Sequence, residues 1–211
     1  MTLPEFLAAQ TRARAINVTV TGHSLGGCLS STLALALKDT TTRWSPGFPS
    51  TIRSWSFAGP TAGNRDFATY TDMRLGSSLH RWVNTLDVAP LAWNESTLNN
   101  AWTIYSSYGI SPNIFERTAL EIAKLAASGL HYTQPSVGTV TKAGDFNPAP
   151  AYRGYASQAD WQHTDGYAKI LGLLGVLPRK TLAPTPERIA ARLEALQQRP
   201  PRTGYAAPTL A

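Results

Sequence analysis

Ser24 is the residue of this sequence best suited to nucleophilic chemistry. It stands in the run Gly-His-Ser-Leu-Gly-Gly, which follows β-favouring residues at 17–21 and precedes a helical pattern. A serine on a tight strand-to-helix turn presents its hydroxyl above the sheet, and the N–H groups that open the helix point to the same place. We expect Gly22 and Gly26 to permit the close approach of strand and helix. We also expect the N–H of Leu25 to be an oxyanion donor.

A serine hydroxyl needs a histidine to accept its proton and an acid to orient that histidine. Of the four histidines, His23 adjoins Ser24 and is expected to point to the opposite side of the turn, in a packing or hydrogen-bonding role. His80 begins a strand and should lie about 20 Å from the edge at which parallel strands end. His163 is the favoured base because it lies downstream of both the serine and the acid, and His131 is the alternative.

Asp87 is the favoured acid. It follows the apolar strand pattern at 79–84 and precedes Val-Ala-Pro, so it falls at a strand end, where an orienting carboxylate belongs. Asp160 and Asp165 are too close in sequence to His163 to act from a separate strand end. Asp165 is better suited to capping a helix expected at 166–174, after a loop that carries His163. The other aspartates considered are expected to be solvated charges: Asp66, Asp72 and Asp145.

The elements that position these residues alternate between strands and helices. Strands are expected at 17–21, 52–58 and 79–84, and helices at 2–14, from Leu25 onward and at 65–73. This order predicts an α/β fold with a mostly parallel sheet flanked by helices. Residues 39–50 are expected to be a loop. In the helix after Ser24, leucines recur every four residues, which predicts a buried helix: Leu25, Leu29, Leu33 and Leu37.

Residues 91–130 interrupt this alternation with an aromatic-rich, helical insertion. Because it follows Asp87, Trp93 and Trp102 are candidates for an acyl pocket or a lid, and the alternative is a helical decoration that covers the sheet. After the insertion, a small hairpin is expected from 132–134 and 137–141. Within the insertion itself, Ser111-Pro112 should open a helix that stops at Gly129. The apolar side of that helix comprises Ile114, Phe115, Ile122, Leu125 and Ala126.

Composition and charge limit the classes of function that the sequence supports. The chain has 211 residues, 43% hydrophobic and 15% charged, which is enough for one globular domain at 1–178. Residues 179–211 form a Pro-containing tail with a pattern typical of a short helix; its six basic and two acidic residues account for +4 of the net charge of +6. No nucleic-acid motif accompanies this charge, so we expect a solvated end rather than a nucleic-acid site, with transient contact to a lipid surface as the alternative.

The cysteine count and the N-terminal sequence bear on the compartment. Cys28 is the sole cysteine, which excludes an intrachain disulfide. No signal peptide and no apolar run of membrane-spanning length is recognisable, which favours the cytoplasm. The sequence does not fix the oligomeric state.

These motifs resemble the class 3 lipase family, the fungal-type triacylglycerol lipases and their bacterial relatives within the α/β-hydrolases. The run at 20–27 resembles the family's elbow. The family's next conserved blocks resemble three further runs: Phe-Ala-Gly-Pro at 57–60, Arg-Trp-Val-Asn at 81–84 and Asp-Val-Ala-Pro at 87–90. His163 before Tyr167 and Leu171 resembles its histidine region more loosely. The resemblance covers about residues 3–175.

The resemblance implies a hydrolase of carboxylic esters, with fatty-acid esters as the expected substrate. Ser24 would be the nucleophile, Asp87 the orienting acid and His163 the base of a Ser-His-Asp triad that works through an acyl-enzyme. Such a reaction needs no metal or cofactor.

The chain departs from the family in length, because only 23 residues precede Ser24. The family's N-terminal half supplies further strands, the lid and a second oxyanion donor, and no residue here can be assigned that donor. One such donor is worth about 10²–10³ in turnover. We therefore expect that Met1 is not the ancestral start. The fold implied is a partial α/β-hydrolase, and the alternative function is a catalytically inactive lipase-like protein or interaction module.

Overall fold

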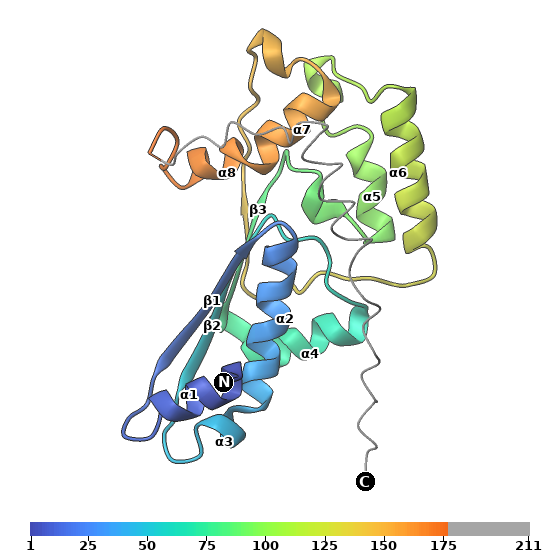
Figure 1. The fold of residues 1–211 in the computed structure, drawn as a ribbon. Helices are drawn as coiled ribbons and strands as arrows, with labels where there is room; N and C mark the ends of the chain where they lie inside the picture. The colour runs from blue at the N-terminus through green and yellow to red at the C-terminus, as the bar shows by residue number, and fades with distance from the viewer. Residues whose placement is uncertain (177–211) are drawn as a thin grey trace, which may run out of the picture. The chain divides into compact units, whose positions relative to one another are not determined.

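A four-stranded parallel sheet forms the centre of the computed structural model, which describes residues 1–176 (Figure 1). The strands are β1 (Asn17–His23), β2 (Thr51–Phe57), β3 (Leu79–Asn84) and β4 (Thr139–Lys142), and they lie in that order across the sheet. His23 pairs with Phe57, and Phe57 pairs with Trp82, so the carboxyl ends of β1, β2 and β3 meet at one edge. The expected α/β fold with a parallel sheet is confirmed.

Eight α-helices accompany the sheet within residues 1–176. They are α1 (Leu3–Gln10), α2 (Leu25–Asp39), α3 (Thr41–Trp44), α4 (Arg65–Leu75), α5 (Glu95–Ala101), α6 (Ile114–Ala127), α7 (Tyr155–His163) and α8 (Asp165–Ile170). α2 packs on β1 and β2 and touches α4, while α5 and α6 run side by side in the insertion (Figure 1). None of these helices is long and apolar enough to cross a membrane. The tail at 179–211 lies outside the described residues.

Two of the expected element boundaries were wrong near the N-terminus. α1 starts as its sequence indicates, with a capping box between Thr2 and Glu5, but it ends at Gln10 instead of residue 14. The hydroxyl of Thr11 donates to the carbonyls of Leu7 and Trp44, which ends the helix and ties it to α3. The loop expected at 39–50 contains α3, and the buried indole of Trp44 donates to the carbonyl of Leu37 at 3.0 Å.

The expected burial of the leucine row on α2 was wrong for three of its four members. Leu25, Leu29 and Leu33 are exposed, and only Leu37 is buried. The face against the sheet is instead built from small residues. At Gly27 a Cβ would lie 2.5 Å from the carbonyl oxygen of Phe57, so large side chains cannot face the sheet there. The buried positions of α2 are Gly27, Ser30, Ser31, Ala34, Leu35 and Leu37.

The hairpin expected around residue 135 does not form. β4 pairs parallel with β3, from Arg81 opposite Thr139 to Asn84 opposite Lys142. The carboxylate of Asp72 accepts hydrogen bonds from the backbone N–H groups of Ser136 and Val137, and this directs the chain to the sheet edge. Asp72 is therefore a structural anchor and not only a solvated charge.

Two clusters of buried side chains hold the fold together. One lies between the sheet, α1, α2 and α3 and includes Leu35, Trp44 and Leu79. The second joins the insertion to the end of β3 and to α7, and it comprises Leu86, Tyr105, Ile110 and Tyr155. Burial of such side chains contributes roughly 1.5–3 kcal/mol each. The second cluster fixes the region around Asp87.

Candidate active site

The turn that carries Ser24 is strained and tightly packed. Ser24 has φ 58° and ψ −128°, a backbone conformation that L-residues rarely adopt. Its N–H donates to the carbonyl of Phe57 at 2.9 Å, which ties the turn to the end of β2. A Cβ at Gly22 would collide with the backbone at Gly26, whereas a Cβ at Gly26 would meet open space. The expected steric role of Gly26 was therefore wrong, and it is Gly22 and Gly27 that must lack a Cβ.

The loop after β2 packs directly against this turn. Gly59 lies so close to α2 that a Cβ would stand 3.0 Å from the backbone nitrogen of Cys28. Ala58 is fully buried with φ 55°, and its N–H donates to the carbonyl of Trp82 at 3.2 Å. The buried guanidinium of Arg81 donates to the Gly59 carbonyl at 3.5 Å. Burial lowers the pKa of Arg81 to about 10, so it remains charged at neutral pH.

His163 lies within hydrogen-bond distance of the serine. Its Nε2 is 2.8 Å from Ser24 Oγ. The residue is the last of α7, not part of a loop as the sequence suggested. α8 then begins at Asp165 itself with Thr164 at the N-cap position, so the expected capping by the Asp165 side chain was wrong. The end of α7 thus delivers the imidazole to the turn at the end of β1.

Asp87 contacts the other ring nitrogen of His163. The distances from Nδ1 to the two carboxylate oxygens are 3.1 and 3.0 Å. Asp87 is only 1% exposed, and its Oδ1 also accepts a hydrogen bond from the Ala89 N–H at 2.9 Å. A carboxylate only accepts hydrogen bonds, so Nδ1 carries the proton and Nε2 is left free to accept one from Ser24.

This arrangement can move a proton from a hydroxyl to an imidazole. The serine oxygen lies beside an unprotonated nitrogen, and the imidazolium that forms faces a buried carboxylate. Burial of that carboxylate strengthens its interaction with the imidazolium, since few waters screen it. Leu25 opens α2 directly after the serine, and the first N–H groups of a helix lack intrahelical acceptors.

A buried polar network that sequence reasoning missed holds the end of α7 to the end of β3. The side-chain amide of Asn84 donates to the carbonyl and to Oε1 of Gln162 at 3.0 and 2.8 Å. Gln162 in turn donates to the Asp145 carbonyl at 2.7 Å, and the backbone N–H of Asn84 donates to the hydroxyl of Tyr167 at 3.0 Å. The polar Asn84 at the end of an apolar strand was the available signal.

Two buried phenols surround the carboxylate region. Tyr105 donates to the Leu86 carbonyl at 2.7 Å, and Tyr167 packs edge-on against His23. Burial raises the pKa of both hydroxyls, and the negative charge of Asp87 raises each further. Both phenols therefore stay neutral at neutral pH.

Of the remaining histidines, His23 lies where the sequence did not predict it, and His80 lies away from the three residues. His23 was expected on the opposite side of the turn, but its Nε2 lies 2.6 Å from the backbone carbonyl of His163 and the two rings are 4.7 Å apart. Burial, and then the neighbouring His163, lower the pKa of His23, so its neutral form donates this bond. His80 stacks on Trp55 at 4.2 Å, away from the strand ends.

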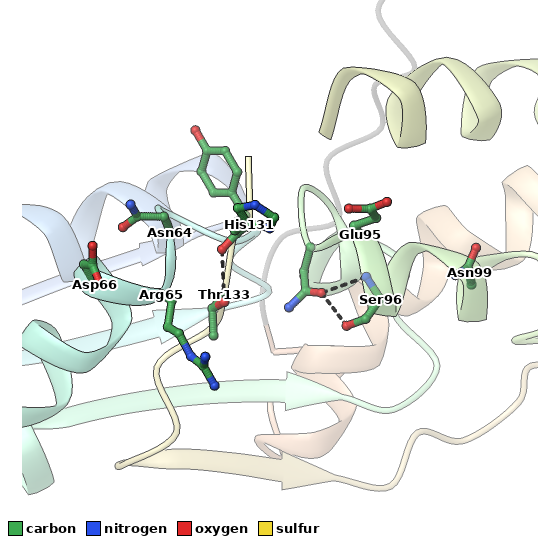
Figure 2. A pocket seen from close by; sticks show the side chains of 10 residues that line it. Asn64, Arg65, Asp66, Glu95, Ser96, Asn99, His131 and Thr133 are labelled. Atoms are coloured by element: carbon green, nitrogen blue, oxygen red, sulfur yellow. Dashed lines mark hydrogen bonds between the residues drawn. The ribbon is translucent and has the colours of Figure 1, made fainter. Parts of the chain in front are cut away.

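His131 lines a polar cleft of about 870 Å³ that Figure 2 shows in close-up. The cleft lies between the start of α4, near Asn64 and Arg65, and the start of α5, near Glu95. His131 has φ 51°, and its carbonyl accepts a hydrogen bond from Thr133. None of Ser24, Asp87 and His163 lines the cleft, so His131 is separated from the candidate site.

Trp93 and Trp102 are not joined to the three residues by any described contact. Within residues 1–176, neither indole forms a hydrogen bond or an aromatic contact with Ser24, Asp87 or His163. Trp93 is exposed with φ 71°, and Trp102 caps the end of α5. Their role as acyl-pocket residues stays a prediction.

Comparison with known proteins finds a family, a curated relative and a solved structure that are similar to this chain. The family model for class 3 lipases matches residues 2–96. Over 73 residues the chain is 38% identical to the secreted mono- and diacylglycerol lipase MDL2 of Malassezia globosa, covering 35% of this chain and 22% of that protein. The crystal structure of M37 lipase matches with a TM-score of 0.77 at 37% identity, over 84% of this chain and 53% of that one. The chain thus spans about half of M37 lipase and a smaller share of the Malassezia protein.

Proposed function

We propose that the chain is a member of the class 3 lipase family and contributes the Ser24–His163–Asp87 triad of a serine hydrolase that cleaves carboxylic esters of fatty acids. The observation that carries this proposal is the continuous path of hydrogen-bond contacts. Ser24 Oγ lies 2.8 Å from His163 Nε2, and His163 Nδ1 lies 3.0 Å from the buried Asp87 carboxylate. Nucleophile, base and orienting acid are recognised by such geometry rather than by sequence position.

The proposed reaction proceeds through an acyl-enzyme. Ser24 Oγ attacks the ester carbonyl carbon while its proton passes to His163 Nε2, and the carbonyl oxygen becomes an oxyanion that accepts from the Leu25 N–H. His163 then protonates the alcohol oxygen as the C–O bond breaks. A water molecule gives its proton to His163 and attacks the acyl carbon. The carboxylic acid leaves, and the proton returns to Ser24.

The substrate class follows from the relatives by analogy. The Malassezia protein is by name a mono- and diacylglycerol lipase, and M37 is by title a lipase. We propose a glycerolipid or a related fatty-acid ester, with Trp93 and Trp102 contributing to acyl binding. The cytoplasmic location favoured by the sequence stays a prediction, since the Malassezia relative is by name secreted.

A second candidate function is an interaction module that keeps the turn but lacks turnover. The observation that favours it is the exposed row of Leu25, Leu29 and Leu33 beside Ser24, which has no covering layer within residues 1–176. In this alternative, the row of exposed leucines on α2 binds another protein, and Ser24 has only a structural role in the turn. The chain would then fold without hydrolysing any ester.

Hydrolysis of a series of p-nitrophenyl esters separates the two functions. The wild-type chain, Ser24→Ala and the control Ser107→Ala, whose serine is exposed and far along the insertion, are compared on acetate, butyrate, octanoate and palmitate esters. We expect Ser24→Ala alone to lose turnover, by about 10⁴-fold or more. Equal rates for all three proteins, or none for folded wild type, would exclude the hydrolase.

A further inference from the structure

Asn84 joins the part of the chain that carries the proposed acid to the part that carries the proposed base. It ends β3 and is fully buried. Its side-chain oxygen accepts a hydrogen bond from the N–H of Leu86, the residue before Asp87, at 3.0 Å. Its side-chain nitrogen donates to the backbone carbonyl and to Oε1 of Gln162, the residue before His163, at 3.0 and 2.8 Å. One amide therefore bonds to the chain neighbour of the acid and to the chain neighbour of the base.

These bonds require an amide at position 84. The Leu86 N–H can only donate, and the backbone carbonyl of Gln162 can only accept. The side chain between them must therefore accept at one end and donate at the other. A carboxylate would lack the donor, and an apolar side chain would leave both backbone groups buried without a partner, which is unfavourable.

Two glycines bring bare backbone against both ends of this amide. A Cβ at Gly144 would lie 2.1 Å from Oδ1 of Asn84, and a Cβ at Gly166 would lie 2.8 Å from its Nδ2. Such a close approach is possible only where the neighbour has no side chain. The amide of Asn84 is therefore enclosed at the two atoms that make its hydrogen bonds.

The partners of Asn84 are held from their other sides as well. Gln162 is fully buried, and its Nε2 donates to the carbonyl of Asp145 at 2.7 Å. The backbone carbonyl of Asn84 accepts from the N–H of Asp87 at 3.0 Å, and its backbone N–H donates to the hydroxyl of Tyr167 at 3.0 Å. A displacement of Asn84 would therefore be transmitted both to Asp87 and to the end of α7.

The contact that depends on this arrangement is the one between Asp87 and His163. The two residues are 76 positions apart in the sequence, and Nδ1 of the imidazole lies 3.1 and 3.0 Å from the two carboxylate oxygens. A displacement of about 1 Å at a catalytic group can cost about 10²-fold in rate. A side chain that sets this distance acts on the reaction without touching the substrate.

We propose that Asn84 is a positioning residue, whose amide fixes the separation of Asp87 and His163. This inference rests on the proposed function and adds to it a residue that acts only through the triad. The alternative is that the amide stabilises the fold and has no effect on turnover by the folded protein.

Steady-state hydrolysis of p-nitrophenyl butyrate by Asn84→Ala tests the proposal, at a temperature at which circular dichroism shows each protein to be folded. We expect kcat to fall by about 10²-fold and KM to change by less than about 3-fold, because Asn84 does not meet the substrate. Gln162→Met keeps the length of the side chain and removes Oε1, and we expect kcat to fall by about 10-fold. This second variant carries the test if Asn84→Ala does not fold.

Thr11→Val is the matched control for a lost buried hydrogen bond. The Thr11 hydroxyl is buried and ties α1 to α3, at the other end of the sheet from the candidate site. This variant should lose stability and keep the wild-type kcat. An equal decrease of kcat in the control would overturn the proposal.

The substitution Asp87→Asn separates positioning from stabilisation. If Asn84 acts through the contact of Asp87 with His163, its loss matters little once that contact is altered. Asn84→Ala with Asp87→Asn should therefore be less than about 3-fold slower than Asp87→Asn alone, and Gln162→Met is combined with Asp87→Asn in the same way. Two losses that multiply in full would refute the positioning role.

Comparison of the wild-type chain with Ser24→Ala distinguishes the two possible failures. A folded wild type without Ser24-dependent hydrolysis would refute the proposed function, and with it a role for Asn84 in that reaction. Ser24-dependent hydrolysis that Asn84→Ala and Gln162→Met retain in full would refute the positioning role alone.

Discussion

The turn at Ser24 and the insertion at 91–130 are held by different kinds of contact. The turn is fixed by backbone: Ser24 bonds the Phe57 carbonyl, and Gly22 and Gly27 leave no room for a Cβ. The insertion is fixed by side chains, such as Tyr105 and its neighbour Tyr155 on α7, and its outer face is exposed among the described residues 1–176. The difference shows that the reacting atoms are placed by steric limits that tolerate no added side chain at these glycines, whereas the insertion is held from its inner side by packed aromatic rings.

The largest effect is expected where the two regions meet, at Asp87. Asp87→Asn keeps the shape of the side chain but replaces one accepting carboxylate oxygen by a donating amide nitrogen. The amide nitrogen favours an unprotonated His163 Nδ1, so the imidazole is held in the wrong tautomer. We expect kcat on p-nitrophenyl butyrate to fall by about 10⁴-fold with the thermal midpoint little changed. Asp145→Asn, which changes an exposed carboxylate paired with Lys169, is the control and should keep nearly full activity. A decrease of less than about 10-fold in Asp87→Asn would contradict the assigned role.

The next largest effect is a loss of stability, and it tests only the turn at Ser24, where neighbouring backbone atoms leave no room for a side chain. Gly22→Ala places a methyl group against the Gly26 backbone, and we expect it to lower the free energy of unfolding by more than about 4 kcal/mol, or to prevent folding. Gly26→Ala has open space and is expected to be neutral or to stabilise α2 by up to about 1 kcal/mol. Urea unfolding of both proteins measures the contrast. Similar stabilities would show that the turn is not limited by backbone contacts.

These two predictions also indicate which parts of the fold and of the candidate site could be predicted from the sequence. The turn, β1 to β3 and the grouping of Ser24, Asp87 and His163 were accessible because glycine spacing and strand ends follow local rules; the triad roles stay predictions. The buried face of α2 was missed because periodicity finds an apolar side without showing which side meets the sheet. A strand at 137–141 was expected, but the parallel pairing of β4 with β3 was missed because the place of β4 depends on Asp72, which lies more than 60 residues earlier.

A smaller effect is expected inside the insertion, at Tyr155. Its hydroxyl donates to the Ala101 carbonyl at 2.6 Å, and burial raises its pKa to about 12. The unfolded chain loses this proton near pH 10, so stability present below about pH 10 should be lost as the pH rises toward 12. Tyr155→Phe should cost about 1–2 kcal/mol at neutral pH and reduce this alkaline loss. An unchanged slope of stability against pH in the variant would contradict the assignment to Tyr155.

The smallest effect is expected at His23, which touches the site without belonging to the triad. Its bond to the His163 carbonyl positions the end of α7, so His23→Ala should lower kcat by about 5- to 10-fold and leave KM nearly unchanged. His23→Gln, which retains a donor, should recover part of the loss. His80→Ala is the control, because that ring stacks on Trp55 away from the strand ends. Equal effects at His23 and His80 would show a general loss of stability instead.

The most direct test of the account is to map the site of covalent modification by a fluorophosphonate probe. The reagent reacts with a serine only when a neighbouring base activates it, so it reports the proposed triad without requiring the right ester. We predict a single adduct, on the peptide that contains Ser24, which disappears in Ser24→Ala and in His163→Ala and persists in Ser107→Ala. A folded chain that takes up no probe, or labelling of another serine, would contradict the central claim that this turn holds an activated nucleophile.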